Sequence, residues 1–440
     1  MQRSKIRGHT APTIAASIEE AVHSGGLRPG DLLPAIRPLA ATLRVSPVTV
    51  AAAYRRLHAR GLVSGDGRRG TRIRPNPPSP VPPIEQVVIP DGVVDLATGN
   101  PDLALLPSLD RALRTAIVAP RLFGEPPVLR PLLTFAAGEF AADGVPVEGI
   151  TVTSGGLDAI ERLLREHVRP GDRVGVEDPS LPALLDLVAG SGYVAVPIAT
   201  DAHGARPAAV EEALAHGARA LIITARGQNP TGAALVPERA TELLQRLRGR
   251  DEVLLIENDP AGPVAGVPLV TLSGGSHPRW AVVRSVSMFL SPDLRVAIVA
   301  GDPLTIARLQ GRQSLGPRWV STILQQLALS LWSDPSSGRR LARAADVYTQ
   351  RRRALLEALA DHGIETDARS GFNVWIPVRA ETATVQSLAA RGWAVAAGER
   401  FRIRSEPAIR VTTSALAPEA ARRFAADLAA SAHRPAAASA

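Results

Sequence analysis

Short polar segments follow the apolar runs of the central sequence and could bind a charged small molecule. One run, Ile150 to Val152, leads into Gly155 and Gly156, which stand where a strand would enter a helix. Backbone N–H groups at the start of a helix are unpaired and lie at the positive end of its dipole, so they can bind a phosphate. The other segments of this kind are Glu177-Asp178-Pro179, Gln228-Asn229-Pro230, Glu257-Asn258-Asp259 and Ser285.

The arginines of the first 75 positions concentrate positive charge in one part of the chain. These positions hold 12 arginines and Lys5 against four acidic residues, a net charge of +9. The remaining chain holds 37 arginines against 38 acidic residues, a net charge of −1. A basic footprint confined to one small segment is typical of a module that binds a polyanion such as DNA.

The elements that must position the arginines are predicted from apolar spacing and turn residues. Helices are expected over about 10–24, 36–43 and 47–60, followed by a hairpin over 62–74 with a glycine- and arginine-rich tip. Ser46 is a good N-cap for the third helix, and Pro47 suits its first position. The pattern predicts three helices and a two-stranded wing.

From Val93 to about Gly316, helical stretches alternate with the short apolar runs described above. This alternation predicts a mainly parallel sheet, in which ligands bind at the carboxyl ends of the strands. A helical section is expected through roughly 321–362, and a smaller α+β unit with strands near 373–377 and 409–412 follows.

The predicted domain organisation has five segments. They are a DNA-binding domain (1–75), a proline-rich linker (76–92), a large sheet domain (93–316), connecting helices with a small C-terminal domain (317–434), and a tail without structure (435–440). The proline content of the linker excludes a helix or a central strand there and indicates a semi-rigid connection.

The composition excludes several classes of function. There is no cysteine in the chain, which excludes disulfides, thiolate metal sites and cysteine nucleophiles, and no metal site is predicted. The sequence opens without a charged and apolar leader, and no apolar run approaches the ~20 residues that span a bilayer. We therefore expect a cytoplasmic protein without a membrane partner.

The order of elements in the first 75 residues resembles the GntR-type winged helix. The resemblance rests on Gly26-Leu27-Arg28-Pro29-Gly30-Asp31, on residues 33–40 and on Val45-Ser46-Pro47-Val48-Thr49-Val50. It implies that the start of the third helix enters the major groove of a double-stranded DNA operator. The expected DNA-binding residues are Arg37, Ser46, Pro47, Thr49, Arg55, Arg56, Arg68 and Arg69. Pro47 departs from the family, in which many members have arginine, so one contact is in doubt.

The rest of the chain, about Val93 to Ala430, resembles fold-type I aminotransferases. The motifs are Gly99-Asn100-Pro101-Asp102, Thr153-Ser154-Gly155-Gly156, Glu177-Asp178-Pro179, Gln228-Asn229-Pro230-Thr231-Gly232, Ser285-Val286-Ser287 and Ile409-Arg410-Val411. The whole chain resembles MocR-type transcription regulators. This resemblance implies a multidomain fold, namely a winged helix-turn-helix plus an α/β PLP-transferase type I fold with large and small domains, assembled as a homodimer.

The resemblance also assigns a pyridoxal 5'-phosphate site. Gly155, Gly156, Ser285, Ser287 and Arg295 correspond to the phosphate clamp. Asn229 corresponds to the donor to the ring hydroxyl oxygen, and Asn258 falls at the position beside the ring nitrogen. Arg410 matches the arginine that grips a ligand carboxylate, with a structural ion pair as the alternative interpretation.

Several residues depart from the family at the positions that make the cofactor reactive. Met288 replaces the Schiff-base lysine, and Lys5 is the only lysine of the chain. Asn258 replaces the aspartate that keeps the ring nitrogen protonated; Asp259 could substitute only if the strand ended before it. Leu181 replaces a stacking aromatic residue, and Pro260 or Ala261 replaces a partner of the ring oxygen. No residue is therefore predicted to be catalytic, and pyridoxal phosphate would bind non-covalently or not at all.

Three hypotheses follow. The first is a DNA-binding transcription regulator whose inactive aminotransferase-like domain senses a phosphorylated or carboxylated effector and dimerises. The second is a working aminotransferase with an appended DNA-binding head. The third is a structural dimer that binds no ligand.

Overall fold

The computed structural model describes residues 6–23, 26–28, 30–59, 62–66, 70–73, 89–116, 121–274 and 277–432. The chain divides into two compact units. Residues 6–73 are called the head and residues 89–432 the body, and each is described by itself.

The head consists of three helices and a hairpin. The helices are α1 (Ala11–His23), α2 (Ile36–Leu43) and α3 (Pro47–Ala59), and β1 (Val63–Asp66) pairs antiparallel with β2 (Gly70–Ile73). Ser46 caps α3 as expected, since its Oγ accepts from the backbone N–H of Thr49 at 3.1 Å. The predicted helices and hairpin are found; Arg60, Arg68, Arg69 and Arg74 lie outside the described residues.

A small apolar core holds the head together. Ile14 and Ile18 of α1 pack with Val50, Leu57 and other apolar residues of α3 and the hairpin. The Tyr54 hydroxyl donates to the carbonyl oxygen of Pro34 at 2.6 Å, which ties α3 to the segment before α2. The outer face of α3 is therefore free of core packing, as a DNA-reading helix requires.

The large sheet of the body has the strand order β4-β11-β10-β9-β8-β5-β6-β7. The strands are β4 (Gly149–Thr153), β5 (Arg173–Asp178), β6 (Val194–Asp201), β7 (Gly204–Ala205), β8 (Ala218–Thr224), β9 (Leu254–Asp259), β10 (Trp280–Ser285) and β11 (Ala297–Gly301). The pairs β5–β8, β8–β9 and β9–β10 are parallel, whereas β11 is antiparallel to both neighbours. The prediction of a mainly parallel sheet is confirmed.

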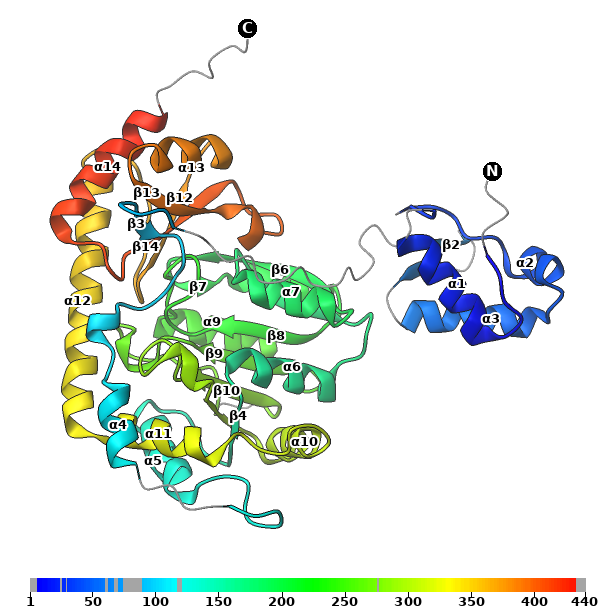
Figure 1. Cartoon of the computed structure of the whole chain (residues 1–440), viewed down its shortest axis with the longest axis horizontal. Helices are drawn as coiled ribbons and strands as arrows, with labels where there is room; N and C mark the ends of the chain where they lie inside the picture. The colour runs from blue at the N-terminus through cyan, green and yellow to red at the C-terminus, as the bar shows by residue number, and fades with distance from the viewer. Residues whose placement is uncertain are drawn as a thin grey trace, which may run out of the picture. The chain divides into compact units, whose positions relative to one another are not determined.

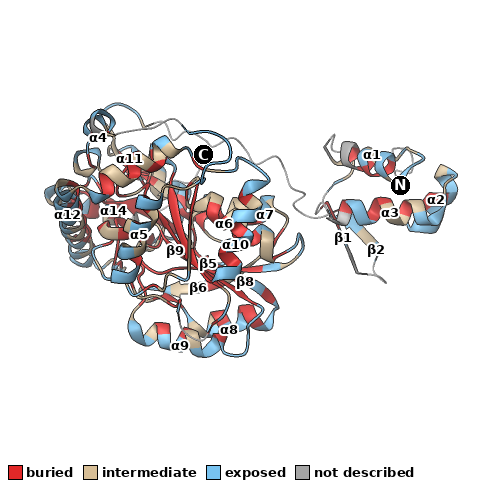
Figure 2. Ribbon diagram, turned by 90° about the horizontal axis from the view of Figure 1, so that it is seen from below, coloured by how far each residue is buried: buried red, intermediate tan, exposed pale blue. Residues whose placement is uncertain are grey.

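Helices cover this sheet and bury its strands, as Figures 1 and 2 show. The helices of this part of the body are η1 (Leu103–Leu105), α4 (Leu109–Thr115), α5 (Arg130–Ala142), α6 (Gly156–His167), α7 (Pro182–Gly190), α8 (Pro207–Ala215), α9 (Pro237–Leu247), η2 (Gly262–Val264), η3 (Pro292–Leu294), α10 (Pro303–Ser314) and α11 (Thr322–Ser333). The residues Leu254 to Ile256 in β9 are fully buried, as expected for a parallel strand covered on both faces.

A second sheet, of four strands, has the order β12-β14-β13-β3. It is built from β3 (Val94–Leu96), β12 (Asn373–Pro377), β13 (Trp393–Ala397) and β14 (Ala408–Thr412), with α12 (Pro335–Ala360), α13 (Glu381–Ala389), η4 (Gly398–Phe401) and α14 (Pro418–Ala432). The long helix α12 reaches from α11 to α14 (Figure 1).

The position of β3 differs from the expectation that residues 93–316 form one domain. Val94 pairs with Trp393, and Leu96 with Val395, so the start of this segment joins the C-terminal sheet. Leu96 is fully buried in the core of that sheet. The pairing joins residues almost 300 positions apart, and local sequence carries no signal for it.

No helix among the described residues is long and apolar enough to cross a membrane. Most of the proposed linker (76–92) and the whole of the proposed tail (435–440) lie outside the described residues.

Candidate functional site

The first turn of α6 and the segment after β10 form a cradle suited to an anion. Gly155 has φ +98°, and a Cβ there would lie 2.6 Å from Nη2 of Arg295. A Cβ on Gly156 would lie 3.6 Å from Cβ of Ser285, and the Ser285 Oγ donates to the Ser287 Oγ at 3.1 Å. The structure therefore brings Gly155, Gly156, Ser285, Ser287 and Arg295 together.

The electrostatics of the cradle favour a negatively charged group. Arg295 is exposed and has φ +48°, a left-handed conformation that is uncommon outside glycine and clusters at functional sites. The nearest carboxylate along the helix, Asp158, accepts from the Ser154 N–H at 2.9 Å and pairs with Arg162 at 2.8 Å. Because Arg162 balances Asp158, the Arg295 charge and the helix start can act on a bound phosphate.

A pocket of about 100 Å³ lies at the carboxyl ends of β8 and β9. Thr224 and Asn258, which line it, are partners in the parallel register of these strands. The remaining lining residues are Gly99, Ser180, Leu181, Leu184, Gly227, Asn229, Pro260, Ala261, Met288, Gly371, Phe372 and Asn373. The sequence-predicted positions Leu181, Asn229, Asn258 and Met288 are thus brought together around one pocket.

The pocket offers neutral polar groups and apolar walls. Met288 contributes a thioether, which has no amine and no titratable proton. The carboxamide of Asn258 can donate or accept a hydrogen bond but carries no charge. Leu181, Pro260 and Ala261 also line the pocket, at the positions where the family resemblance implies a stacking aromatic residue and a partner of the ring oxygen. Such a pocket suits an uncharged ring.

Asp259 does not take the place of a charged partner in this pocket. The strand β9 runs through Asp259, so its side chain points away from the face that carries Asn258. It accepts from Arg226 Nε at 2.9 Å and from Arg284 Nε at 2.7 Å, and Arg284 is its register partner on β10. The possibility that Asp259 substitutes for the family aspartate is therefore wrong.

Arg410 is buried beside the pocket with one donor unpaired. Its Nη1 donates to Asn229 Oδ1 at 3.4 Å and its Nη2 to the carbonyl oxygen of Ala97, whereas Nε has no partner. Burial lowers the pKa of Arg410 to about 10, against the opposing charge of Asp95. A Cβ on Gly99 would come within 2.8 Å of Nη1. Among the residues that the structure describes, no carboxylate forms an ion pair with Arg410, and a ligand carboxylate would satisfy the orphan donor.

Asp178 connects the rim of the pocket to the C-terminal sheet region. It accepts from the N–H groups of Ile403, Arg404 and Ser405 at 2.9, 2.7 and 3.0 Å. The Ser180 N–H also donates to the carbonyl oxygen of Phe401 at 2.7 Å, and the centre of the Phe401 ring lies 5.0 Å from the Arg410 guanidinium. The segment 401–405 is thereby held between the pocket rim and Arg410.

Sequence inspection missed several residues of this site. Phe372 and Asn373 come from the start of β12, and Asn373 Oδ1 accepts from the Thr412 hydroxyl at 3.0 Å. They reach the pocket because the C-terminal sheet packs beside the carboxyl ends of the large sheet, a tertiary arrangement. Of these missed residues, only Thr224 could have been predicted from the sequence, because it ends an apolar run just before a polar segment.

In the head, the described candidate DNA contacts lie on two helices. Ser46 and Pro47 are exposed before and at the start of α3, and Thr49 is half-buried. Arg55 and Arg56 are exposed further along α3, and Arg37 is exposed in the first turn of α2. Arg72, on strand β2 of the hairpin, donates from Nη1 to the carbonyl oxygen of Gly30 at 3.0 Å. Arg68 and Arg69 lie outside the described residues.

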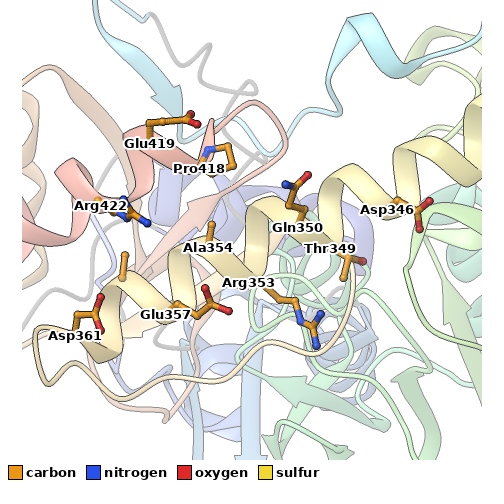
Figure 3. A pocket seen from close by; sticks show the side chains of 11 residues that line it. Asp346, Thr349, Gln350, Arg353, Ala354, Glu357, Asp361, Pro418, Glu419 and Arg422 are labelled. Atoms are coloured by element: carbon orange, nitrogen blue, oxygen red, sulfur yellow. The ribbon is translucent and has the colours of Figure 1, made fainter.

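A larger groove, of about 510 Å³, lies between α12 and the start of α14 (Figure 3). Its lining carries charged groups of both signs, all of them exposed: Arg353, Arg422, Asp346, Glu357, Asp361 and Glu419. A mixed and solvated lining of this kind does not select a ligand charge, so the groove is not a candidate site.

Two family models match the chain. The model for aminotransferase class I and II matches residues 91–428, and the model for bacterial regulatory proteins of the gntR family matches residues 10–73. Among solved structures, the body is similar to kynurenine aminotransferase of Pyrococcus horikoshii, with a TM-score of 0.69 and 21% identity over 77% of this chain and 90% of that one. The predicted fold class is confirmed.

Curated relatives extend over both units. The chain is 40% identical over 427 residues to the vitamin B6 salvage pathway transcriptional repressor PtsJ of Salmonella typhimurium, covering 96% of this chain and 98% of the relative. It is 30% identical over 364 residues to the HTH-type pyridoxine biosynthesis transcriptional regulator PdxR of Corynebacterium glutamicum, covering 79% and 78%. The chain therefore belongs to the MocR-type transcription regulators, in which a GntR-type DNA-binding head is fused to an aminotransferase class I and II domain.

Proposed function

We propose that the body is a non-catalytic sensor that binds pyridoxal phosphate reversibly and thereby changes operator binding by the head. The observation that carries this proposal is the combination of an intact anion cradle with a ring pocket that presents Met288 instead of an amine. A cradle without the reactive amine is useful for recognition but not for transamination. The names of the two relatives, which concern vitamin B6, support the same class of effector.

The residues present fit the phosphate and the ring in different ways. Gly155, Gly156, Ser285, Ser287 and Arg295 would hold the phosphate. Asn229 would face the ring hydroxyl, since its Oδ1 is engaged by Arg410 and its Nδ2 is left to donate. When bound in an active family member, the cofactor supplies an electron sink for amino-acid chemistry; here no side chain of the pocket supplies a base.

Asn258 would bind the ring in its uncharged form. Its carboxamide lines the pocket and can donate to an unprotonated ring nitrogen. Replacing a charge-assisted hydrogen bond by a neutral one costs roughly 1 to 2 kcal/mol, which is about one decade of affinity. Binding should therefore be weaker than in an enzyme and reversible, as a sensor requires.

The body also carries an exposed apolar patch that supports a homodimer. Phe123 is 80% exposed, and its ring contacts Trp319 with 5.6 Å between centroids. Exposed aromatic clusters of this kind mark association surfaces, and a two-fold dimer would match two heads to a repeated or palindromic operator.

The test is to incubate the full-length protein with sheared DNA of its source organism at physiological salt, with and without pyridoxal phosphate, and to sequence the bound fragments. We expect one or a few intergenic sites whose occupancy changes with pyridoxal phosphate but not with inorganic phosphate. Uniform recovery that disappears at moderate salt would reflect counterion release alone and would contradict a specific regulator.

Two glycine variants distinguish a specific role of the cradle in ligand binding from a general effect of backbone strain. Gly155→Ala is expected to remove the response to pyridoxal phosphate, because its Cβ would collide with Arg295. Gly171 has a closely similar φ of +97° but nothing within 4 Å of a Cβ, so Gly171→Ala shares the backbone strain and should keep the response. Equal behaviour of the two variants would count against the cradle.

The second candidate function, a working aminotransferase, predicts covalent capture of the cofactor. In the wild-type protein, borohydride treatment with pyridoxal phosphate should leave no permanent label in the body, which contains no lysine. Met288→Lys, made together with Lys5→Arg to remove the only other lysine, should gain a permanent label at residue 288. Peptide mass spectrometry measures both. A label in the wild-type body, or none at a folded Lys variant, would contradict the assigned position of Met288.

A further inference from the structure

The exposed face of α3 carries a large apolar side chain at its first turn. Val48 is 71% exposed, while Val50, Ala53 and Leu57 of the same helix are fully buried in the head core. Val48 therefore points away from the core, on the side of α3 that also exposes Arg55 and Arg56. Val48 is not part of the apolar core of the head, and its exposed apolar surface is unfavourable in water.

The polar groups of the same turn are largely engaged with each other. The Ser46 Oγ accepts from the Thr49 N–H at 3.1 Å, and the Ser46 and Thr49 hydroxyls are 2.8 Å apart. One of the two hydroxyl protons is used in that contact, and Pro47 has no N–H to donate. The turn thus offers little for bidentate hydrogen bonding to a base edge, whereas the Val48 side chain is 71% exposed there.

We propose that Val48 determines sequence preference by contacting the 5-methyl group of a thymine in the major groove. This proposal rests on the proposed function, because it requires α3 to enter the groove of an operator. Thymine is the only base with a methyl group in the major groove, and apolar side chains recognise it by excluding water between them. Each half-site should therefore hold one thymine whose methyl group matters, in addition to positions read by other residues.

The experiment uses the full-length protein and a binding site selected from a random duplex library at physiological salt. In the best-bound duplex, each thymine is replaced singly by deoxyuridine, which lacks only the methyl group, and Kd is measured by fluorescence anisotropy. At one thymine per half-site, we expect deoxyuridine to weaken binding about fourfold, which corresponds to ~0.8 kcal/mol for one methyl group removed from water. Val48→Ala should bind the thymine duplex more weakly and should bind both duplexes equally.

Leu304→Ala serves as the matched control, since Leu304 is 53% exposed on α10 of the body. It should retain the fourfold preference for thymine. If Val48→Ala keeps that preference, or if the wild-type protein distinguishes deoxyuridine at no position, the assignment of Val48 is overturned while sequence-specific binding stands. If no duplex is enriched in the selection, the proposed function itself fails and this inference fails with it. A thermal melt of each variant confirms that the head is folded.

Discussion

Replacing Asp259 by asparagine is expected to lower the free energy of unfolding of the body by about 3–5 kcal/mol. The carboxylate is fully buried between two buried arginines, Arg226 and Arg284, and Asp143 completes the group with contacts of 3.1 and 2.6 Å to them. Gly262 adds a backbone donor to Asp259 at 3.1 Å. Asparagine would leave two cationic groups with only one carboxylate, which is costly in the interior.

The contribution of Asp259 to the free energy of unfolding depends on pH in a definite direction. Burial tends to raise the pKa of Asp259, but Arg284 and Arg226 overcome that effect and hold it at about 2, below its ordinary value of 3.8. A carboxyl with a lowered pKa in the folded state stabilises the protein above its unfolded pKa. That stabilisation is lost as the pH falls from about 4 through 2. The asparagine variant should lack this part of the acid sensitivity.

Urea unfolding followed by tryptophan fluorescence measures the effect, because all five tryptophans of the chain lie in the body. The control is Glu211→Gln, which breaks an exposed pair with Arg246 at 3.0 Å and should cost less than about 1 kcal/mol. A cost for Asp259→Asn no larger than that of the control would contradict the buried four-residue group. Ligand binding at the pocket should be unchanged in any folded Asp259 variant, since Asp259 faces away from Asn258.

Glu177→Gln should abolish a stability loss that the wild-type body shows as the pH rises from about 4.5 to about 7. Glu177 is buried below the pocket rim, where it accepts from the Thr224 N–H at 3.1 Å and from Gln228 Nε2 at 3.3 Å. Burial raises the pKa of Glu177 from 4.5 to about 7, and these hydrogen bonds offset only part of that effect. The folded state therefore holds a proton that the unfolded state releases at lower pH.

The direction in which stability changes with pH follows from the linkage between proton binding at Glu177 and folding. A group whose pKa is raised by folding contributes its full stabilisation below its unfolded pKa of 4.5 and loses it as the pH rises through about 7. The loss amounts to about 3 kcal/mol at most, taking 1.36 kcal/mol for each pKa unit. Because glutamine is neutral at every pH, the free energy of unfolding of the variant should lack this dependence on pH.

The measurement is the urea midpoint of wild type and variant at pH 5, 6, 7 and 8, again by tryptophan fluorescence. Glu252→Gln, at an exposed glutamate before β9, is the control and should follow the wild type. If wild type and Glu177→Gln have parallel profiles, Glu177 is ionised throughout and the burial argument is wrong.

Local sequence determined much of the head. Ser46 and Pro47 placed the start of α3 because capping and proline geometry act within one turn, and the hairpin followed from its glycines. The position of Val48 outside the core also follows from helical periodicity, although its exposure became evident only when the buried face of α3 was known.

In the body, the sequence determined which strand ends carry the candidate site but not how each side chain is used. Apolar runs followed by polar residues marked Gly155, Asn229, Asn258 and Ser285, because parallel strands end at a common edge. The choice between Asn258 and Asp259 was decided by the end of β9, by Arg284 of the neighbouring strand β10 and by Arg226, which follows the end of β8. The pairing of β3 with β13 and the approach of Phe372, Asn373 and Arg410 to the pocket were decided by tertiary structure alone. They depend on packing between segments hundreds of residues apart, for which no local pattern of residues exists.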